Sequence, residues 1–308
     1  MIKEIQVAKG IRVSELMEQL AESAFNARRL GEACRIYREM VERDAFVFFT
    51  LAGAMIPAGM RGIVDGFMKN DFMSALVTTG ANATHEIAEA LGFRHEMGDE
   101  SSDDVELSRR NINRIYDVFI ENEAFEGVES FVSDIFQELE GEMASYEIMW
   151  EIGKRLPNRS FLRTAHEKRI PVFCPTLHDS VLGLHLFVYG KDLRYSPQKD
   201  VRTMVDLCFQ NRKMGVFIVG GGVPKNFTLQ AMLLAEGFDY AVQITTDSPQ
   251  WGGLSGATLD EAKSWCKLKE RAKTATVYCD ATIALPLIYG YLLDFAKNEK
   301  QNTTNITD

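Results

Sequence analysis

Apolar residues recur at helical spacing over the first part of the chain, residues 13–43. One stripe on this spacing contains Leu16, Met17, Leu20, Ala24 and Leu30. A stripe of this kind is typical of a helix that buries one face against a core. The pattern therefore predicts a helical N-terminal segment over residues 1–44.

Beyond this segment the pattern changes to short, continuously apolar runs, each followed by small or polar residues and then by a helical stretch. Runs that are apolar on both faces suit a parallel sheet covered by helices on both sides. We therefore expect a doubly wound, mostly parallel α/β sheet with Rossmann-like connections. Six runs predict its strands: 45–51, 74–78, 171–174, 216–219, 241–244 and 276–278.

The chain shows no sequence sign of a division into domains. It contains no linker rich in proline or serine and no internal repeat. We expect a single domain over residues 1–308, with an inserted helical region near residues 103–156. The polar tail, residues 297–308, is expected to be frayed.

The balance of basic and acidic side chains disfavours some classes of binding partner. The 308 residues include 34 basic and 44 acidic side chains, for a formal net charge of -10. An acidic surface disfavours nucleic acid and anionic membranes and is compatible with a cationic ligand such as a polyamine. No apolar run approaches the roughly 20 residues of a membrane span, and the N-terminus lacks a signal-peptide pattern. We expect a soluble protein.

The five cysteines indicate the redox compartment of the protein, and the five histidines indicate whether it binds a metal. The cysteines are widely scattered and include no C-x-x-C pair, which favours a reducing cytoplasm. No two histidines lie three or four residues apart with a carboxylate on an obvious common helix. We expect a cytoplasmic protein without a bound metal.

The loops after the predicted strands are candidates for a ligand site, because ligands of open parallel sheets bind beyond the carboxyl ends of the strands. The run Gly220-Gly221-Gly222 follows one strand, and its backbone can approach a phosphate closely. A tight turn explains the run equally well. It lacks the G-x-G-x-x-G spacing, and Pro224 has no N–H.

Polar residues at other strand ends also have two interpretations. The stretch Thr78-Thr79-Gly80-Ala81-Asn82 offers hydroxyl and amide groups to a ligand, but capping of the next helix accounts for Asn82 without one. Asp179 and Asp280 each follow a strand. Either carboxylate could bond ribose hydroxyls or cap a helix.

The segment before Lys267 predicts a short helix. Thr258-Leu259-Asp260-Glu261 matches a capping box with Thr258 as its first residue. If this helix continues regularly, Trp265 shares the face of Glu261, while Lys267 points roughly 120° away. The three side chains can converge only if the helix ends early. A catalytic lysine also needs a partly desolvated amine, because only the free base attacks a carbonyl or an imine.

Taken together, six motifs resemble the deoxyhypusine synthase family, in order and spacing, from about Phe48 to the end of the last helix. They are Thr78-Thr79-Gly80-Ala81-Asn82, Asn111-Ile112-Asn113-Arg114-Ile115, Gly220-Gly221-Gly222-Val223-Pro224-Lys225, Ser255-Gly256-Ala257, Glu261-Ala262-Lys263-Ser264-Trp265-Cys266-Lys267 and Val277-Tyr278-Cys279-Asp280-Ala281-Thr282. Two stretches, Thr79-Gly80-Ala81-Asn82 and Gly253-Leu254-Ser255-Gly256, resemble the branch of the family called deoxyhypusine synthase-like.

The resemblance implies a chemistry and an assembly. Members of this family use NAD to oxidise spermidine, release 1,3-diaminopropane and hold the 4-aminobutyl unit as an imine on a lysine. They then transfer it to an acceptor amine, so there is no net oxidation. They are homotetramers with active sites at subunit interfaces. The imine-forming position matches Lys267, and Glu261 and Trp265 match residues around the polyamine. The positions expected to hold NAD are Thr78, Thr79, Gly80, Asp179, Gly221, Gly222, Thr246, Asp280 and Ala281.

The chain departs from the family pattern near the expected substrate. Asn226 stands where the family carries a histidine, so a general base is missing there. Leu184 and Leu254 stand at acidic positions, so two contacts to a cationic substrate are lost. His85 stands where the protein-modifying branch tends to have a carboxylate, and it could supply the missing base. We therefore place His85 and Asn226 with the expected substrate-binding residues.

Several functions stay open at this point. By family default the acceptor is the lysine of the translation initiation factor 5A precursor, whereas the substitutions favour a free diamine, as in homospermidine synthases. The substitutions are also compatible with a catalytically silent NAD-binding subunit. An ordinary nicotinamide dehydrogenase is suggested by fold alone.

Overall fold

A six-stranded sheet forms the centre of the computed structural model, which describes residues 1–157 and 159–296. Its order is β11-β10-β9-β1-β2-β7, and all neighbouring strands are parallel. The predicted doubly wound parallel sheet and its six strands are confirmed. The strands are β1 (Phe46–Leu51), β2 (Ala75–Thr78), β7 (Val172–Phe173), β9 (Met214–Val219), β10 (Phe238–Thr245) and β11 (Leu268–Tyr278).

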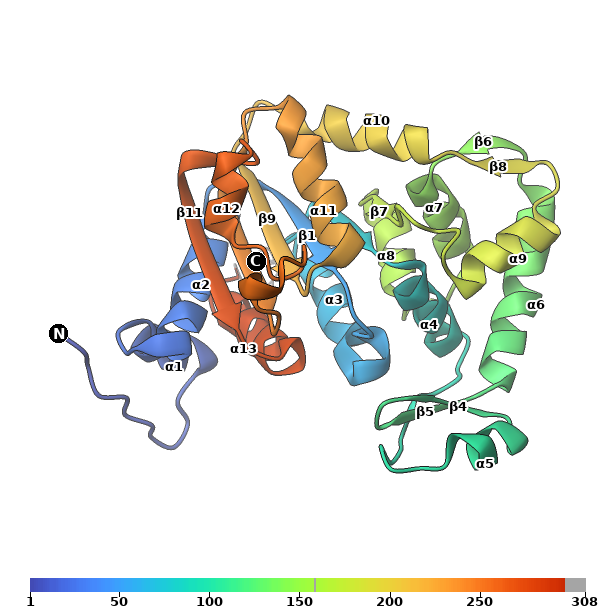
Figure 1. Ribbon diagram of the computed structural model, residues 1–308, viewed down its shortest axis with the longest axis horizontal. Coiled ribbons are helices and arrows are strands. Elements are labelled where there is room, and N and C mark those ends of the chain that lie inside the picture. Colours follow the sequence, from blue (N-terminus) through green and yellow to red (C-terminus); the bar gives the residue numbers. More distant parts are fainter. Residues whose placement is uncertain (158, 297–308) are drawn as a thin grey trace, which may run out of the picture.

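Helices cover both faces of this sheet because its strands are apolar on both sides. In β1, Val47 and Phe49 belong to one buried cluster, while Phe46 and Phe48 belong to another. The first cluster packs beneath α2 (Phe25–Glu42), α3 (Arg61–Lys69) and α13 (Ala281–Leu293). The second packs beneath α10 (Pro197–Cys208), α11 (Gly222–Ala231) and α12 (Leu259–Ser264), of which α11 and α12 lie in front of the strands in Figure 1.

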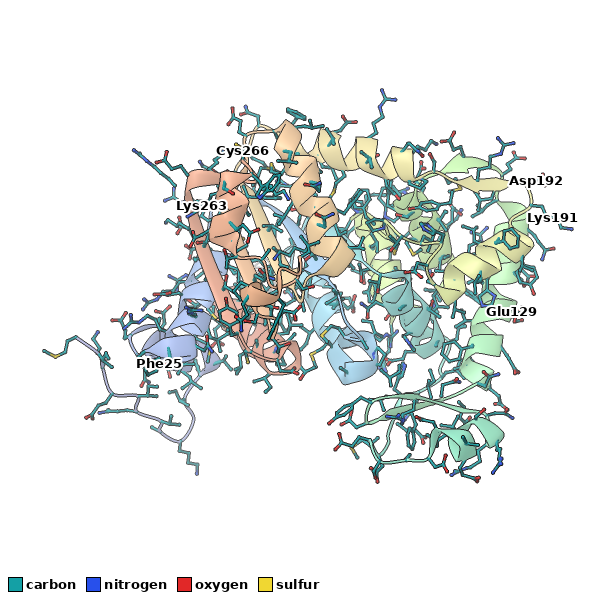
Figure 2. All side chains as sticks on the ribbon, viewed as in Figure 1. Phe25, Glu129, Lys191, Asp192, Lys263 and Cys266 are labelled. Atoms are coloured by element: carbon teal, nitrogen blue, oxygen red, sulfur yellow. The ribbon has the colours of Figure 1, made fainter. Side chains whose placement is uncertain are left out.

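The predicted N-terminal helical segment is present as two helices rather than one. The first, α1 (Val13–Ala21), ends before a break, and α2 begins at Phe25, which Figure 2 labels near the N-terminus. Phe25 has a φ of 55°, a left-handed conformation that interrupts a helix. The two helices then pack closely where α2 has Gly31: a Cβ there would lie 2.4 Å from the backbone nitrogen of Ala21.

The inserted region between β2 and β7 contains strands as well as helices, so the prediction of a helical insertion was incomplete. Residues 96–121 form an arm at the lower right of Figure 1. It contains α5 (Asp104–Arg109) and an antiparallel sheet of β3 (Glu96–Met97), β5 (Val118–Glu121) and β4 (Ile112–Ile115). Asn111 and Tyr116 adopt positive φ, one before β4 and one between β4 and β5. The positive-φ turns at Asn111 and Tyr116 bound strands that the helical interpretation overlooked.

The remaining elements complete the chain order. They are π-helical η1 (Ile56–Met60), α4 (Gly80–Ala90), β3 (Glu96–Met97), α5 (Asp104–Arg109), β4 (Ile112–Ile115), β5 (Val118–Glu121), α6 (Glu123–Glu138), β6 (Gly141–Met143), α7 (Ser145–Arg155), α8 (Phe161–Lys168), α9 (Val181–Tyr189), β8 (Leu193–Tyr195) and the 3₁₀ turns η2 (Met232–Leu234) and η3 (Pro249–Trp251). Among the described residues, no helix is long and apolar enough to cross a membrane. The tail predicted to be frayed, 297–308, lies outside them.

The pairing of β10 with β11 contains one irregularity. Phe238 pairs with Leu268, and the next pair joins Tyr240 to Lys273. Between these two pairs, one residue of β10 (Asp239) stands opposite four residues of β11 (269–272). The excess residues of β11 form a bulge. Beyond it, pairing is regular to the carboxyl ends of both strands.

Candidate functional site

The parallel sheet brings all nine residues expected to hold NAD to its carboxyl edge. Each is the last residue of a strand or lies in the connection that follows it. Thr78, Thr79 and Gly80 end β2 or follow it, Asp179 follows β7, Gly221 and Gly222 follow β9, Thr246 follows β10, and Asp280 and Ala281 follow β11. This edge is where open α/β sheets bind ligands.

Several of these residues also have structural roles. The hydroxyl of Thr78 donates to the carbonyl of Leu51 at 2.9 Å and accepts from Asn82 Nδ2 at 3.2 Å. Thr79, rather than Asn82, is the N-cap of α4, which begins at Gly80. Asp280 is the N-cap of α13 and accepts from the backbone N–H of Thr282 at 2.7 Å. The helix-capping interpretation therefore holds for Asp280, although its carboxylate remains exposed.

Asp179 and Thr246 are exposed to solvent at the same edge. Ser180, not Asp179, caps α9, with its Oγ accepting from Gly183 N at 3.0 Å. A Cβ on Gly80 would lie 2.3 Å from Ser180 Oγ. Only glycine therefore lets the start of α4 touch the start of α9, and this contact holds Asp179 close to the β2 end.

The glycine run after β9 forms a close contact with the segment before α12. Gly220 and Gly222 have φ values of 72° and 57°, which favour glycine. A Cβ on Gly221 would lie 2.4 Å from Ser255 Cα, and Gly222 N donates to Ser255 Oγ at 3.0 Å. The run is thus a tight turn that also allows a close backbone approach.

The helix before Lys267 ends early, as convergence of the three predicted side chains requires. Thr258 caps α12 by accepting from Glu261 N at 3.0 Å. At the other end Cys266 has a φ of 56°, and Lys267 N donates to the carbonyl of Ala262 at 3.0 Å, which is the pattern of a Schellman motif. Figure 2 labels Cys266 at this turn.

The early end places Lys267 beside Trp265. Lys267 Nζ lies 5.6 Å from the centroid of the Trp265 ring, within the range of a cation–π contact. The indole is 61% exposed and Lys267 is half-buried. An exposed aromatic face and an amine therefore share one surface, with the exposed carboxylate of Glu261 one turn back along α12.

A second lysine, Lys225, belongs to the same neighbourhood, although no role was predicted for it from the sequence. It lies in the first turn of α11 and is only 1% exposed. Its pKa is lowered to about 8, chiefly by burial; Glu261 and Asp247 oppose this shift, and the charge of Lys267 adds to it. These charges therefore act on one another, and we call Lys225, Asp247, Glu261, Trp265 and Lys267 the lysine cluster. The position of Lys225 about one turn after the glycine run was the signal in the sequence that could have identified it as a site residue.

His85 does not join this cluster within one chain. Its Nδ1 lies 2.9 Å from His95 Nε2, and His95 Nδ1 lies 2.8 Å from a carboxylate oxygen of Glu89. Burial, and then the charge of His95, lower the pKa of His85 to about 4. His85 follows β2, whereas Lys267 precedes β11. The strands β2 and β11 are four positions apart in the sheet. Measured across the strands, the two residues are therefore separated by roughly 19 Å.

The three departures from the family pattern lie on different elements. Asn226 follows Lys225 on α11 and is half-buried. Leu254 is 38% exposed beside the cluster and supplies a carbonyl to Lys225, while Leu184 is 62% exposed on α9. Leu254 therefore presents an apolar surface where a carboxylate was expected.

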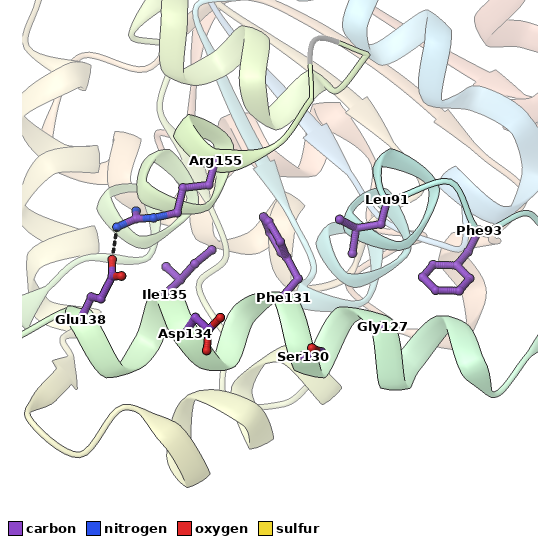
Figure 3. Close-up of a pocket in the computed structure, with 9 residues that line it drawn as sticks. All are labelled: Leu91, Phe93, Gly127, Ser130, Phe131, Asp134, Ile135, Glu138 and Arg155. Atoms are coloured by element: carbon purple, nitrogen blue, oxygen red, sulfur yellow. Dashed lines mark hydrogen bonds and ion pairs between the residues drawn. The ribbon is translucent and has the colours of Figure 1, made fainter.

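A separate cavity of about 520 Å³ lies between α4, α6 and α7. Figure 3 shows its apolar floor and the ion pair between Glu138 and Arg155, 2.6 Å long, at one end. Its lining includes none of the predicted site residues. Among the described residues, no group of three or more His, Cys, Asp or Glu side chains could hold a metal ion.

A family model for deoxyhypusine synthase matches residues 15–292. The chain belongs to the deoxyhypusine synthase family. It is 66% identical over 290 residues to "Probable deoxyhypusine synthase 1" of Archaeoglobus fulgidus, covering 94% of this chain and 96% of that protein. It is 45% identical to the protein of the same name from Methanosarcina acetivorans, covering 93% and 92%. Membership confirms the resemblance and supports transferase function.

Solved structures share the fold. A deoxyhypusine synthase homologue from Entamoeba histolytica superimposes with a TM-score of 0.64 at 18% identity, covering 94% of this chain and 96% of that one. The complex of AgrE with ornithine and NAD+ superimposes with a TM-score of 0.58 at 12% identity, covering 89% of this chain and 34% of that one. At these identities the likeness concerns the fold alone.

Proposed function

We propose that this deoxyhypusine synthase family member transfers the 4-aminobutyl group of spermidine to an acceptor amine through an imine on Lys267. The observation that carries the proposal is the Schellman end of α12, because it places Lys267 Nζ against the exposed face of Trp265. Family membership supplies the reaction class. The geometry is consistent with a lysine that meets a cationic, partly apolar substrate.

The carboxyl edge suits NAD. Exposed carboxylates such as those of Asp179 and Asp280 can accept hydrogen bonds from ribose hydroxyls, and Thr79 and Thr246 add hydroxyl groups. The N-termini of α4, α11 and α13 lie along this edge, and helix dipoles there favour phosphate. When bound there, NAD would take a hydride from the carbon beside the secondary amine of spermidine and return it after transfer.

The chain's own residues account for the steps between those two hydride transfers. The free amine of Lys267 attacks the oxidised carbon, 1,3-diaminopropane leaves, and the four-carbon unit stays as an imine on Nζ. The acceptor amine then attacks this imine and frees Lys267. Trp265 offers an aromatic face to the polyamine, and the carboxylates of Glu261 and Asp247 attract its ammonium groups.

The acceptor is either a protein lysine or a free diamine. The translation initiation factor 5A precursor is the family default. The apolar Leu254 at the cluster and the exposed Leu184 on α9 reduce the carboxylates available to a large basic partner and favour the smaller amine. Both acceptors use the same Lys267 imine, so they can be tested in one preparation.

The first experiment traps the imine. Purified protein is incubated with NAD and spermidine, reduced with cyanoborohydride, digested and analysed by mass spectrometry. We expect one aminobutyl unit on Lys267 and none in Lys267→Arg. Lys263→Arg, which changes a nearby lysine on α12, should retain the adduct. If NAD binds but no adduct forms, the chain is a silent subunit or uses another donor.

A second experiment identifies the acceptor. Spermidine labelled in its aminobutyl part is supplied with NAD and with equal concentrations of the initiation factor precursor and putrescine. Label in the protein supports the default acceptor, and label in homospermidine supports the alternative. Net accumulation of NADH with neither product would contradict transfer and indicate a dehydrogenase.

A further inference from the structure

Lys225 is a buried ammonium whose hydrogen-bond partners are all uncharged. Its Nζ donates to the carbonyls of Ala257 at 2.6 Å and Leu254 at 2.9 Å, and to Gln243 Oε1 at 3.2 Å. A longer contact, 3.4 Å, reaches the carbonyl of Ser255. Burial of a charge is costly unless its hydrogen bonds are satisfied, so a fully buried lysine on this scaffold calls for an explanation.

These bonds join three parts of the site. Lys225 itself follows the glycine run, and Gln243 lies on β10 near its carboxyl end. Gln243 Nε2 donates in turn to the carbonyls of Gly220 at 3.0 Å and Ser255 at 2.8 Å. The glycine turn, the strand and residues 254–257 are therefore held as one unit.

That unit determines how α12 begins. Ala257 directly precedes the N-cap Thr258, and α12 has only six residues. A helix this short has little stability of its own, so its direction depends on what fixes its two ends. The Schellman turn fixes the end that carries Lys267, and the Lys225 bonds fix the end that carries Glu261.

The charges that face Lys225 come from three neighbouring segments. Glu261 lies on α12, Asp247 in the loop after β10, and Lys267 before β11. Of these, only Lys267 disfavours the ammonium form of Lys225, and this repulsion is mutual. The ammonium of Lys225 therefore adds a buried positive charge to the surroundings of Lys267.

We propose that Lys225 is a positioning residue for the transfer reaction: its buried ammonium anchors the start of α12 to the glycine turn and keeps a positive charge near Lys267. This inference rests on the proposed function. It assigns Lys225 no contact with substrate. It predicts that removing the ammonium slows formation of the Lys267 adduct more than it weakens NAD binding.

The main test compares Lys225→Met with Lys168→Met. Lys168 is a control away from the site: its Nζ also donates to two carbonyls, those of Met68 at 3.0 Å and Lys69 at 2.9 Å, and it pairs with Asp71. Adduct formation is measured at saturating spermidine and NAD across pH. We expect Lys225→Met to slow it by about 100-fold, the effect of a small misplacement, and Lys168→Met to leave it unchanged.

A second variant changes the charge beside Lys225, removes the two bonds that Gln243 Nε2 donates to Gly220 and Ser255, and covers the case in which Lys225→Met does not fold. Gln243→Glu keeps an acceptor for Lys225 but places a carboxylate against its ammonium. The carboxylate favours the ammonium form of Lys225, whose pKa is about 8; we therefore expect slower adduct formation whose loss at alkaline pH moves to higher pH, with NAD affinity close to wild type.

The outcomes distinguish the two proposals. If the wild type forms no adduct, the proposed function fails. If the wild type forms it and a folded Lys225→Met forms it at the same rate and with the same pH profile, the positioning role fails. If Gln243→Glu keeps the wild-type pH profile, the proposed effect of the positive charge of Lys225 is wrong.

Discussion

At the scale of single residues, the turn at Cys266 is the feature on which the position of Lys267 depends. A residue with a side chain normally pays roughly 1–2 kcal/mol to adopt the left-handed conformation, and glycine does not. Cys266 is exposed, so packing of its side chain does not compensate. The turn is therefore strained at the residue that directly precedes the proposed nucleophile.

Cys266→Gly should relieve this strain. Compared with Cys266→Ala, which also lacks the thiol, we expect a free energy of unfolding about 1 kcal/mol higher, measured by urea denaturation. Both variants should form the Lys267 adduct. Equal stability, or a more stable alanine variant, would contradict the assigned backbone conformation.

A second residue, Glu86, illustrates how a buried carboxylate links stability to pH. It is fully buried on α4, where it accepts from Arg61 Nε at 2.8 Å and from Phe161 N at 3.0 Å. Burial raises its pKa from the ordinary 4.5 to about 7, although Arg61 opposes this. The folded state therefore binds a proton between these values that the unfolded state has lost.

The sign of the effect follows from this proton. The contribution of Glu86 is fully present below pH 4.5 and is lost as pH rises through 7, a loss on the order of 3 kcal/mol. Urea denaturation at pH 5 and pH 8 should show this loss in the wild type and a smaller one in Glu86→Gln. An equal pH dependence in both proteins would contradict the raised pKa.

At the scale of elements, the sequence predicted strands well and connections poorly. Buried runs such as 46–51 are apolar on both faces, which identifies them without any knowledge of their neighbours. The break between α1 and α2 depends on the left-handed conformation of Phe25, and their packing depends on a close contact at Gly31. No local pattern reveals either. Lys225 was missed for the same reason, because its partners lie 18 to 32 positions later in the chain.

The helix pair gives a prediction at this scale. Gly31→Ala places a Cβ 2.4 Å from the backbone of Ala21, so α1 must move, and we expect a loss of about 1–3 kcal/mol of stability. Gly62→Ala is the control, because a Cβ at Gly62 on α3 meets nothing within 4 Å and should stabilise by roughly 0.5–1 kcal/mol. Similar shifts in urea midpoint for both would argue against the close packing.

At the scale of the whole molecule, exposed apolar side chains gather on α9. Leu184, Phe187 and Val188 are 62%, 86% and 54% exposed, and they are neighbours at helical spacing. An apolar face of this kind marks an interface more often than a free surface. We propose that α9 contributes to the homotetramer expected for the family.

Phe187→Asp tests this assignment. We expect light scattering after size exclusion to show a smaller assembly than the wild type, because a carboxylate at the interface would lose its hydration. Val201→Asp is the control, since Val201 is 49% exposed on α10 and stands outside that face. A monomeric wild type, or an unchanged mass in Phe187→Asp, would contradict an interface at α9.

The bulge between β10 and β11 has a consequence for how this site can vary in length. Lys267 precedes β11 and Asp280 follows it, so this strand connects Lys267 to the carboxyl edge. Beyond the bulge the register is fixed from Lys273 to Tyr278, whereas residues 269–272 have no partners of their own in that ladder. We expect insertions or deletions at residues 269–272 to change the bulge and to leave Lys267 and Asp280 in place. The length of chain between Lys267 and Asp280 can therefore change across relatives, and this segment is the natural point for an engineered insertion.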